Sequence, residues 1–343
     1  MLTRRAFLAT GTVAALAGPA LARPAERFLA MSDDARGRHY VTRFGRDGAI
    51  AYDLALPDRG HGIALAPDHA QAVAVARRPG RFLQLFDPAA GRPGAAIEAA
   101  DGYFFCGHAV FSRDGRRLYA TETRAADAEG FIGVYDGGDS WRRIAAWPTR
   151  GGDPHELLPD GDTLVVANGG FGLDEGTGID PSMVRLDARD GSLIEQALPP
   201  DDLSQVSLRH IALADGAVFV AGQYAGPSGD RPPLVARWDR AGLRFLDLGD
   251  RTTAGLANYC GSIAASIDGG RLCVASPRGN RAIVFTPEGQ VLGQTALVDG
   301  CGVAALGEGG FLVTSGRGEI AETDGAPPIR IDDARWDNHA CRG

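Results

Sequence analysis

Residues 102–123, GYFFCGHAVFSRDGRRLYATET, contain the unit from which the rest of the chain is built. An aromatic lead-in and a Gly-His pair open a short apolar run, an Arg-Asp-Gly turn follows, and a second apolar run comes after the turn. The same order of histidine, apolar run and Asp-containing turn recurs in the stretches that begin at His61, His108, His155 and His210. A repeated strand, turn and strand predicts a repeat architecture.

The repeats divide the chain into units of the length of one propeller blade. A four-stranded blade takes about 40–50 residues, and subtraction of successive opening positions gives spacings of 47, 47, 55, 52, 39 and 38. The opening positions are His61, His108, His155, His210, Ser262, Cys301 and His339. Each complete unit ends in a hairpin whose turn is typical of short β-connections. The turn residues are Asp87, Asp136, Asp187, Asp239, Thr286 and Asp324.

The seventh unit is split between the two ends of the chain. Its first strand comes from WDNHACRG, residues 336–343, and its other three from RFLAMSD, RHYVTRFGRDG and AIAYDLAL, residues 27–56. Closing a ring in this way leaves no free sheet edge. The sequence therefore predicts an all-β fold, a seven-bladed β-propeller closed by a C-terminal strand plus N-terminal strands. It forms a single domain over residues 23–343, and six blades is the alternative count.

Composition narrows the classes of function. The net charge of −8 and the absence of a Lys/Arg run argue against nucleic-acid binding. The 48 glycines and 20 prolines favour many short strands joined by turns. No CxxC or CxxCH motif occurs among the five cysteines, which argues against c-type haem and against a structural zinc finger. The cysteines are Cys106, Cys260, Cys273, Cys301 and Cys341.

The N-terminus, MLTRRAFLATGTVAALAGPALA, is typical of a twin-arginine export signal over residues 1–22. Its apolar part is interrupted and shorter than the ~20 residues that span a bilayer, so we expect cleavage after Ala22 and no stable membrane anchor. Because cleavage would remove Arg4 and Arg5, the net charge would change from −8 for the full chain to −10 for the mature chain. The predicted location is the periplasm, where one or two disulfides are permitted.

Five of the seven histidines open the first strand of a unit. Because the first strand of a blade lines the central channel, these residues are expected to form a ring around one channel mouth. Imidazole is a ligand of zinc, copper, iron and nickel. The predicted metal ligands are His61, His108, His155, His210 and His339. A packing role common to the repeats is the alternative interpretation.

The ends of the second strands are expected at the same mouth. They and their neighbours supply a second set of candidates: Glu122, Glu156, Arg77, Asn168, Gln223, Arg278, Cys301 and Arg317. Either glutamate would ligate a metal or orient a histidine, and the three arginines favour binding of a carboxylate or phosphate. We nominate no catalytic residue, because GxSxG, P-loop and HExxH motifs do not occur.

Several motifs together resemble the DUF1513 family of periplasmic proteins over nearly the whole mature chain. They include GH-x-VFS-x-DG-x-x-LY at His108, PHELLPDG-x-TLVVANGG at His155, SIAASIDGGRL-x-V-x-SPRG through Arg278, GFLV-x-SGRGE at Arg317, and the terminal WDNHA. At the position of Cys260 the family usually has an apolar residue, and at the position of Thr123 the family commonly has an asparagine.

The resemblance implies a seven-bladed propeller. Members tend to be encoded beside imelysin-like and di-haem cytochrome-like proteins of periplasmic iron uptake, which implies these partners and makes iron the expected metal, with copper and zinc as alternatives. The leading hypothesis is a monomeric periplasmic metal-binding propeller accessory to iron acquisition. One alternative is a propeller enzyme, lactonase-like or a dehydrogenase, with Arg278 or Arg317 holding an anion and a histidine as base. Another is a protein-interaction scaffold with structural histidines.

Overall fold

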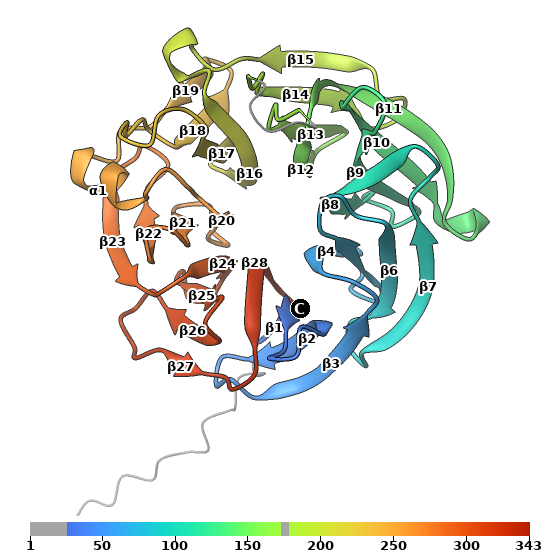
Figure 1. Ribbon diagram of the computed structural model, residues 1–343, viewed down its shortest axis with the longest axis horizontal. Coiled ribbons are helices and arrows are strands. Elements are labelled where there is room, and N and C mark those ends of the chain that lie inside the picture. The colour runs from blue at the N-terminus through green and yellow to red at the C-terminus, as the bar shows by residue number, and fades with distance from the viewer. Residues whose placement is uncertain (1–25, 173–177) are drawn as a thin grey trace, which may run out of the picture.

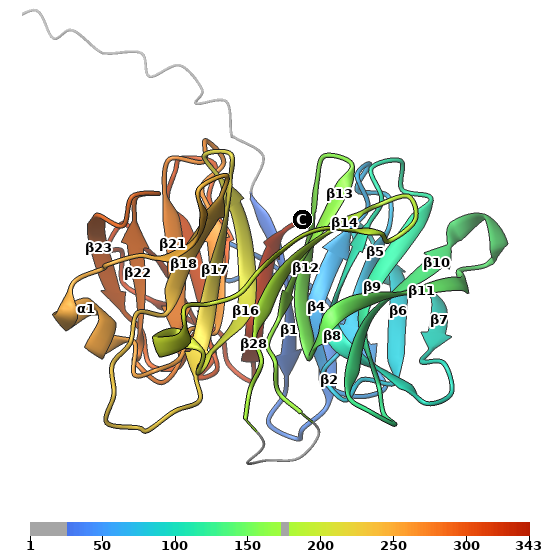
Figure 2. The same ribbon diagram turned by 90° about the horizontal axis from the view of Figure 1, so that it is seen from above.

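The computed structural model describes residues 26–172 and 178–343, and in them seven four-stranded antiparallel sheets surround a central channel (Figure 1). The ring is seen edge-on in Figure 2. The predicted all-β, seven-bladed propeller is confirmed, and the six-bladed alternative is wrong. The predicted export signal, residues 1–22, lies outside the described residues. Within the described ranges, no helix has the length and apolarity needed to cross a membrane.

Six blades are each formed by four consecutive strands, and the first strand in sequence lies innermost (Figure 1). The first two contain β4 (Gly60–Leu65), β5 (Ala72–Ala76), β6 (Phe82–Asp87), β7 (Arg92–Glu98), and β8 (Tyr103–Phe111), β9 (Arg117–Arg124), β10 (Glu129–Asp136), β11 (Arg142–Gly152). The next two contain β12 (Pro154–Asp160), β13 (Thr163–Asn168), β14 (Ser182–Asp187), β15 (Leu193–Ala197), and β16 (Val206–Ala214), β17 (Ala217–Tyr224), β18 (Val235–Asp239), β19 (Gly242–Phe245).

The last two of these six blades are the shortest. They contain β20 (Ser262–Ala265), β21 (Leu272–Ser276), β22 (Arg281–Phe285), β23 (Val291–Ala296), and β24 (Gly300–Ala305), β25 (Phe311–Ser315), β26 (Glu319–Glu322), β27 (Ile329–Arg330). A short helix, α1 (Asp250–Gly255), precedes β20, and two 3₁₀ turns lie at Gly137–Asp139 and Asp201–Leu203.

The seventh blade joins the two ends of the chain. Its innermost strand is β28 (Arg335–Arg342), which pairs antiparallel with β1 (Arg27–Asp33) and is followed by β2 (His39–Gly45) and β3 (Ile50–Leu56). The buried Trp336 on β28 packs on Phe44 of β2, with ring centroids 4.6 Å apart. The predicted closure of the ring is therefore present.

The predicted hairpin turns share one hydrogen bond. At Asp87, Oδ1 accepts the backbone N–H of Ala89 at 2.9 Å, and at Thr286, Oγ1 accepts the N–H of Glu288 at 3.3 Å. In the other four turns, Oδ1 of the aspartate likewise accepts the backbone N–H of the residue two positions later. These aspartates are Asp136, Asp187, Asp239 and Asp324. This side-chain turn explains why Asp and Thr recur at these positions.

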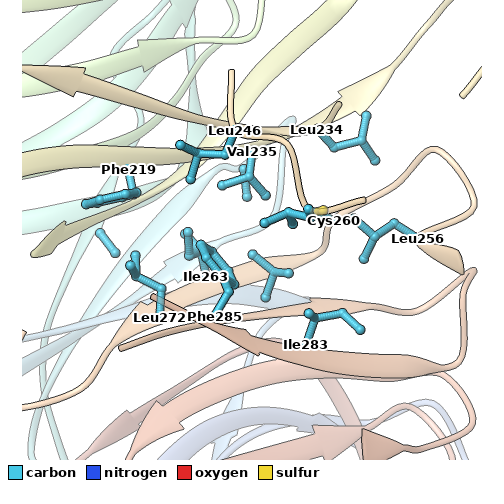
Figure 3. Close-up of a cluster of buried hydrophobic side chains, with 14 of the residues drawn as sticks. Phe219, Leu234, Val235, Leu246, Leu256, Cys260, Ile263, Leu272, Ile283 and Phe285 are labelled. Atoms are coloured by element: carbon cyan, nitrogen blue, oxygen red, sulfur yellow. The ribbon is translucent and has the colours of Figure 1, made fainter. Parts of the chain in front are cut away.

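Neighbouring blades pack face to face through apolar side chains. Figure 3 shows one such cluster, in which Phe219 of β17 lies with Phe285 of β22, both fully buried. Cys260 belongs to the same cluster, and burial raises the pKa of its thiol to about 12. None of the five cysteines, all within the described residues, forms a disulfide.

The closing blade generates a stability prediction. Replacing Trp336 by Ala removes the contact with Phe44 and leaves a cavity, so we expect the free energy of unfolding to fall by about 3–5 kcal/mol. Ile329→Ala on β27, where the side chain is 39 % exposed, is the control and should change it by less than about 0.5 kcal/mol. Denaturant unfolding followed by circular dichroism measures both. Equal effects of the two substitutions would contradict the importance of this closure contact.

Candidate metal centre in the central channel

The five predicted histidines meet inside the channel. They come from the innermost strands of five consecutive blades, β28, β4, β8, β12 and β16. In every pair except His155–His339, the ring centroids are separated by distances from 4.5 Å (His108–His339) to 6.3 Å (His61–His210). Four are buried and His339 is half-buried. The predicted ring around an open mouth is thus instead a compact cluster within the channel, because the side chains turn inward toward one another.

Each of these histidines lies at a shift in the strand pairing. The register of β4 against β5 shifts between Gly60 and Ile63, and that of β12 against β13 shifts between Pro154 and Glu156. The other shifts lie between Phe105 and Ala109, Leu208 and His210, and Trp336 and Ala340. A bulge breaks the regular alternation of side chains and re-aims those nearby. In β20, which carries Ser262 instead of a histidine, the pairing has no shift.

The glycines beside His61 and His108 allow the two strands to approach. A Cβ on Gly62 would lie 2.5 Å from the carbonyl oxygen of Gly107. Gly107 has φ +106°, and a Cβ there would lie 2.6 Å from Cδ2 of His61. Only glycine fits both the backbone conformation and the space. Gly107, before His108, is therefore a steric requirement of the close approach of β8 to His61.

The imidazoles present two overlapping sets of ligand atoms. In the first set, His61, His108 and His339, and in the second, His108, His155 and His210, the nitrogens lie within 4.8 Å of one another. The Nε2 atoms of all five histidines are buried and have no hydrogen-bond partner. His108 belongs to both sets, so it is the centre of the cluster.

The histidines are held in the neutral state, which is the state that binds metals. Burial lowers the pKa of His61 below 6.5, although the hydrogen bond to Asp337 opposes this effect. Burial also lowers the pKa of the other four histidines well below 6.5, and neighbouring positive groups add to the effect.

Asp337 orients the first set. Its Oδ1 lies 2.8 Å from Nδ1 of His61, and its side chain also accepts from Arg59 at 2.6 Å and from Arg77 at 3.3 Å. Burial alone would raise the pKa of Asp337, but the hydrogen bond with His61 and the charges of Arg77 and Arg59 lower it. A carboxylate on Nδ1 leaves Nε2 of His61 free to bind a metal.

Glu156 is the corresponding acid of the second set. Its Oε1 lies 3.7 Å from Nδ1 of His108, and its Oε2 lies 3.5 Å from Nδ1 of His210. Oε2 also accepts the backbone N–H of Ile211 at 2.9 Å. Burial raises the pKa of Glu156 to about 8, and the Ile211 bond opposes this. The sequence prediction that Glu156 adjoins the histidines agrees with this geometry.

Asp153 holds a second pair of arginines near the cluster. It is fully buried and accepts from Arg78 at 2.6 Å and from Arg209 at 3.3 Å. The charges of Arg77 and Arg209 lower the pKa values of His61 and His210. With Arg59, four guanidinium groups face the two carboxylates Asp153 and Asp337. This excess of positive charge favours an anionic group beside the histidines.

Other predicted residues lie away from the cluster. Glu122 bonds Tyr135 of β10 and Arg143 of β11, each at 2.5 Å. Asn168 donates to the carbonyl of Thr149 at 2.9 Å. Both predicted roles beside the metal are therefore corrected. Glu122 ties together the strands of its own blade, and Asn168 joins its blade to β11 of the neighbouring one.

The remaining four candidates contact groups other than the clustered histidines. Cys301 is buried, its Sγ lies 3.2 Å from the carbonyl oxygen of Asp337, and burial raises its pKa to about 12. Arg278 lies over the ring of Tyr259 at 4.8 Å, and the backbone of Gln223 bridges to the same tyrosine. Arg317 lines a separate cavity of about 360 Å³. Of the three predicted arginines, Arg77 is the one that contacts a residue bound to the histidine cluster.

Sequence reasoning missed four charged residues that lie beside the histidine cluster: Asp337, Asp153, Arg209 and Arg59. A pattern for the two acids is present, because each lies two residues before a histidine, in DNH and in DPH. Arg209 immediately precedes His210. Arg59 has no such pattern, since its contact with Asp337 joins the first complete blade to the closing one.

Fold and site together define a seven-bladed propeller whose channel encloses a cluster of neutral histidines. The chain belongs to the DUF1513 family, described as proteins of unknown function, whose model matches residues 54–343. No curated protein gives a significant sequence match. Among solved structures, hydrazine synthase of Kuenenia stuttgartiensis is similar, with a TM-score of 0.65 and 15 % identity over 88 % of this chain and 95 % of that chain. At that identity the similarity shows the fold alone.

The buried histidines predict how stability depends on pH. Below pH about 6.5 they take up protons in the unfolded state but stay neutral when folded, so the free energy of unfolding of metal-free protein should fall as the pH falls. Each such histidine contributes about 1.4 kcal/mol per pH unit. Acids whose pKa burial raises act in the opposite direction: Glu156, up to a pKa of about 8, and also Glu122, Asp153 and Asp299. The five histidines outnumber these four acids.

Urea unfolding between pH 5 and 7 in the presence of a chelator measures this slope. His108→Asn should flatten it, because one buried neutral imidazole is lost. His69→Asn is the matched control: His69 is exposed with φ 55°, a conformation that Asn accepts, and its replacement should leave the slope unchanged. A wild-type stability that is flat or rises toward pH 5 would contradict the prediction.

Proposed function

We propose that this chain is a transition-metal-binding protein and that its channel histidines hold the ion. The observation that carries the proposal is the set of five buried Nε2 atoms without hydrogen-bond partners, grouped in two triads with ligand atoms within 4.8 Å. An unpartnered buried polar atom costs about 1–3 kcal/mol. A bound ion would satisfy one ring nitrogen of each of three histidines at once.

The donor set favours particular metals. Three neutral imidazoles with carboxylates behind them suit zinc, copper, iron or nickel, and do not suit calcium or magnesium, which prefer oxygen ligands. None of the five cysteines belongs to either triad. Three protein ligands also leave a coordination position for an exogenous group, and the excess guanidinium charge favours an anion there.

The role in iron acquisition and the periplasmic location belong to the same proposal. Support comes from the twin-arginine-type N-terminus and from the resemblance to proteins encoded beside imelysin-like and di-haem cytochrome-like neighbours. Elemental analysis of protein isolated from its native compartment tests the metal. Iron near one equivalent is expected, and copper or zinc in its place would overturn the assignment of iron while leaving the histidine site intact.

The overlap of the two triads predicts a hierarchy of variants. Because His108 belongs to both, His108→Ala should abolish binding of Zn²⁺ or Cu²⁺ to the chelator-treated chain. His61→Ala and His155→Ala each leave one triad complete and should retain one ion with reduced affinity. Isothermal titration calorimetry measures affinity and stoichiometry, and circular dichroism confirms folding. Full-strength binding by a His108→Ala/His155→Ala double variant would overturn the site.

The carboxylate behind His61 gives a finer test. Asp337→Asn keeps the shape of the side chain but removes its charge, so metal affinity should fall about 10–100-fold. His69→Asn, on an exposed turn, is again the control and should bind like the wild type. If Asp337→Asn leaves the affinity unchanged in the same titration, the ion does not use the triad that contains His61.

A further inference from the structure

A cavity of about 580 Å³ occupies the part of the channel beyond the histidines. It runs along β4, β8 and β12, from His108 and Glu156 at one end to the turn residues Pro67, Arg113 and Gly161 at the other. These turns join the first and second strands of their blades, so the cavity opens at the mouth opposite the strand starts. Cavities of about 300–1,000 Å³ are the size of small-molecule sites.

The walls of this cavity are apolar. Ile63 and Leu65 from β4, Val110 from β8 and Leu158 from β12 line it, and each is only partly buried. Between the histidine level and the rim these walls carry no ionised side chain among the described lining residues. A charged ligand held there would lose its hydration without gaining a partner. The walls therefore favour an uncharged ligand.

The inner end of the cavity is polar. His108 and Glu156 both face it, and the separation of 3.7 Å between Oε1 of Glu156 and Nδ1 of His108 is too long for a hydrogen bond between them. Oε1 is therefore available to a polar group of a ligand. One polar end and three apolar walls match a molecule with an apolar body and one hydrogen-bonding group.

We propose that this cavity binds a small, uncharged organic molecule, with its apolar body between β4, β8 and β12 and its polar group at Glu156 and His108. The apolar walls and the polar end are present without any ion. Because His108 also belongs to both triads, binding of this molecule is measured on the metal-free chain, where it does not depend on the proposed metal.

The probe is 1-naphthol, a fused aromatic body with one hydroxyl group, added to the chelator-treated full chain. Isothermal titration calorimetry at several temperatures should show saturable binding of one molecule per chain with a negative heat-capacity change. The anion 1-naphthoate should bind at least about tenfold more weakly, since its carboxylate cannot donate a hydrogen bond to Oε1 of Glu156 as the hydroxyl can, and the apolar walls offer its charge no partner. No saturable binding of 1-naphthol, or tighter binding of 1-naphthoate, would overturn the proposal.

Two variants on different walls locate the site. Val110→Trp fills the cavity and Leu158→Asp places a charge in it, and each should weaken 1-naphthol binding at least about tenfold. Ile267→Trp is the matched control, because Ile267 is 63 % exposed on a turn between first and second strands of another blade. Circular dichroism and a parallel Zn²⁺ titration confirm folding and the histidine cluster. Wild-type affinity for 1-naphthol in both folded wall variants would place binding elsewhere.

Discussion

The pairing of β28 with β1 is the interaction on which both fold and site depend. It joins residues from opposite ends of the chain and closes the seventh blade. The same strand delivers Asp337 and His339 to the channel, so ring closure also completes the first histidine triad. A chain whose last strand did not dock would lose a sheet edge contact, a ligand and the carboxylate behind His61 together. Folding and assembly of the site are therefore one event.

The metal-free histidine cluster destabilises the folded state. Five imidazoles with unpartnered Nε2 atoms, each at about 1–3 kcal/mol, are comparable with the whole net stability of about 5–15 kcal/mol expected of a protein. The bulges at the five histidines add irregular pairing in the same place. The stability that sustains this arrangement comes from the apolar clusters between blades, such as the one around Phe219 and Phe285.

Two carboxylates shape the electrostatics around the histidines. Asp337 and Asp153 are each buried, each lie two residues before a histidine, and each hold two arginines. The arginines oppose the effect of burial at both acids: the pKa of Asp337 is lowered, whereas burial still raises the pKa of Asp153. The opposite part of the channel is apolar. A ligand reaching the cluster thus meets charge from one direction and apolar walls from the other.

The sequence by itself determined the fold, the number of blades, the split seventh blade and the identity of the five clustered histidines. It did so because strand, turn and spacing are local patterns that repeat, and Asp and Thr at the turns form hydrogen bonds within two residues. Only the tertiary structure decided which other side chains reach the cluster. Glu122 bonds to the outer strands of its own blade and Asn168 to β11 of the neighbouring blade, whereas Arg59 and Asp337 meet across 278 residues. Such contacts depend on strand bulges and on packing between blades, which no local pattern records.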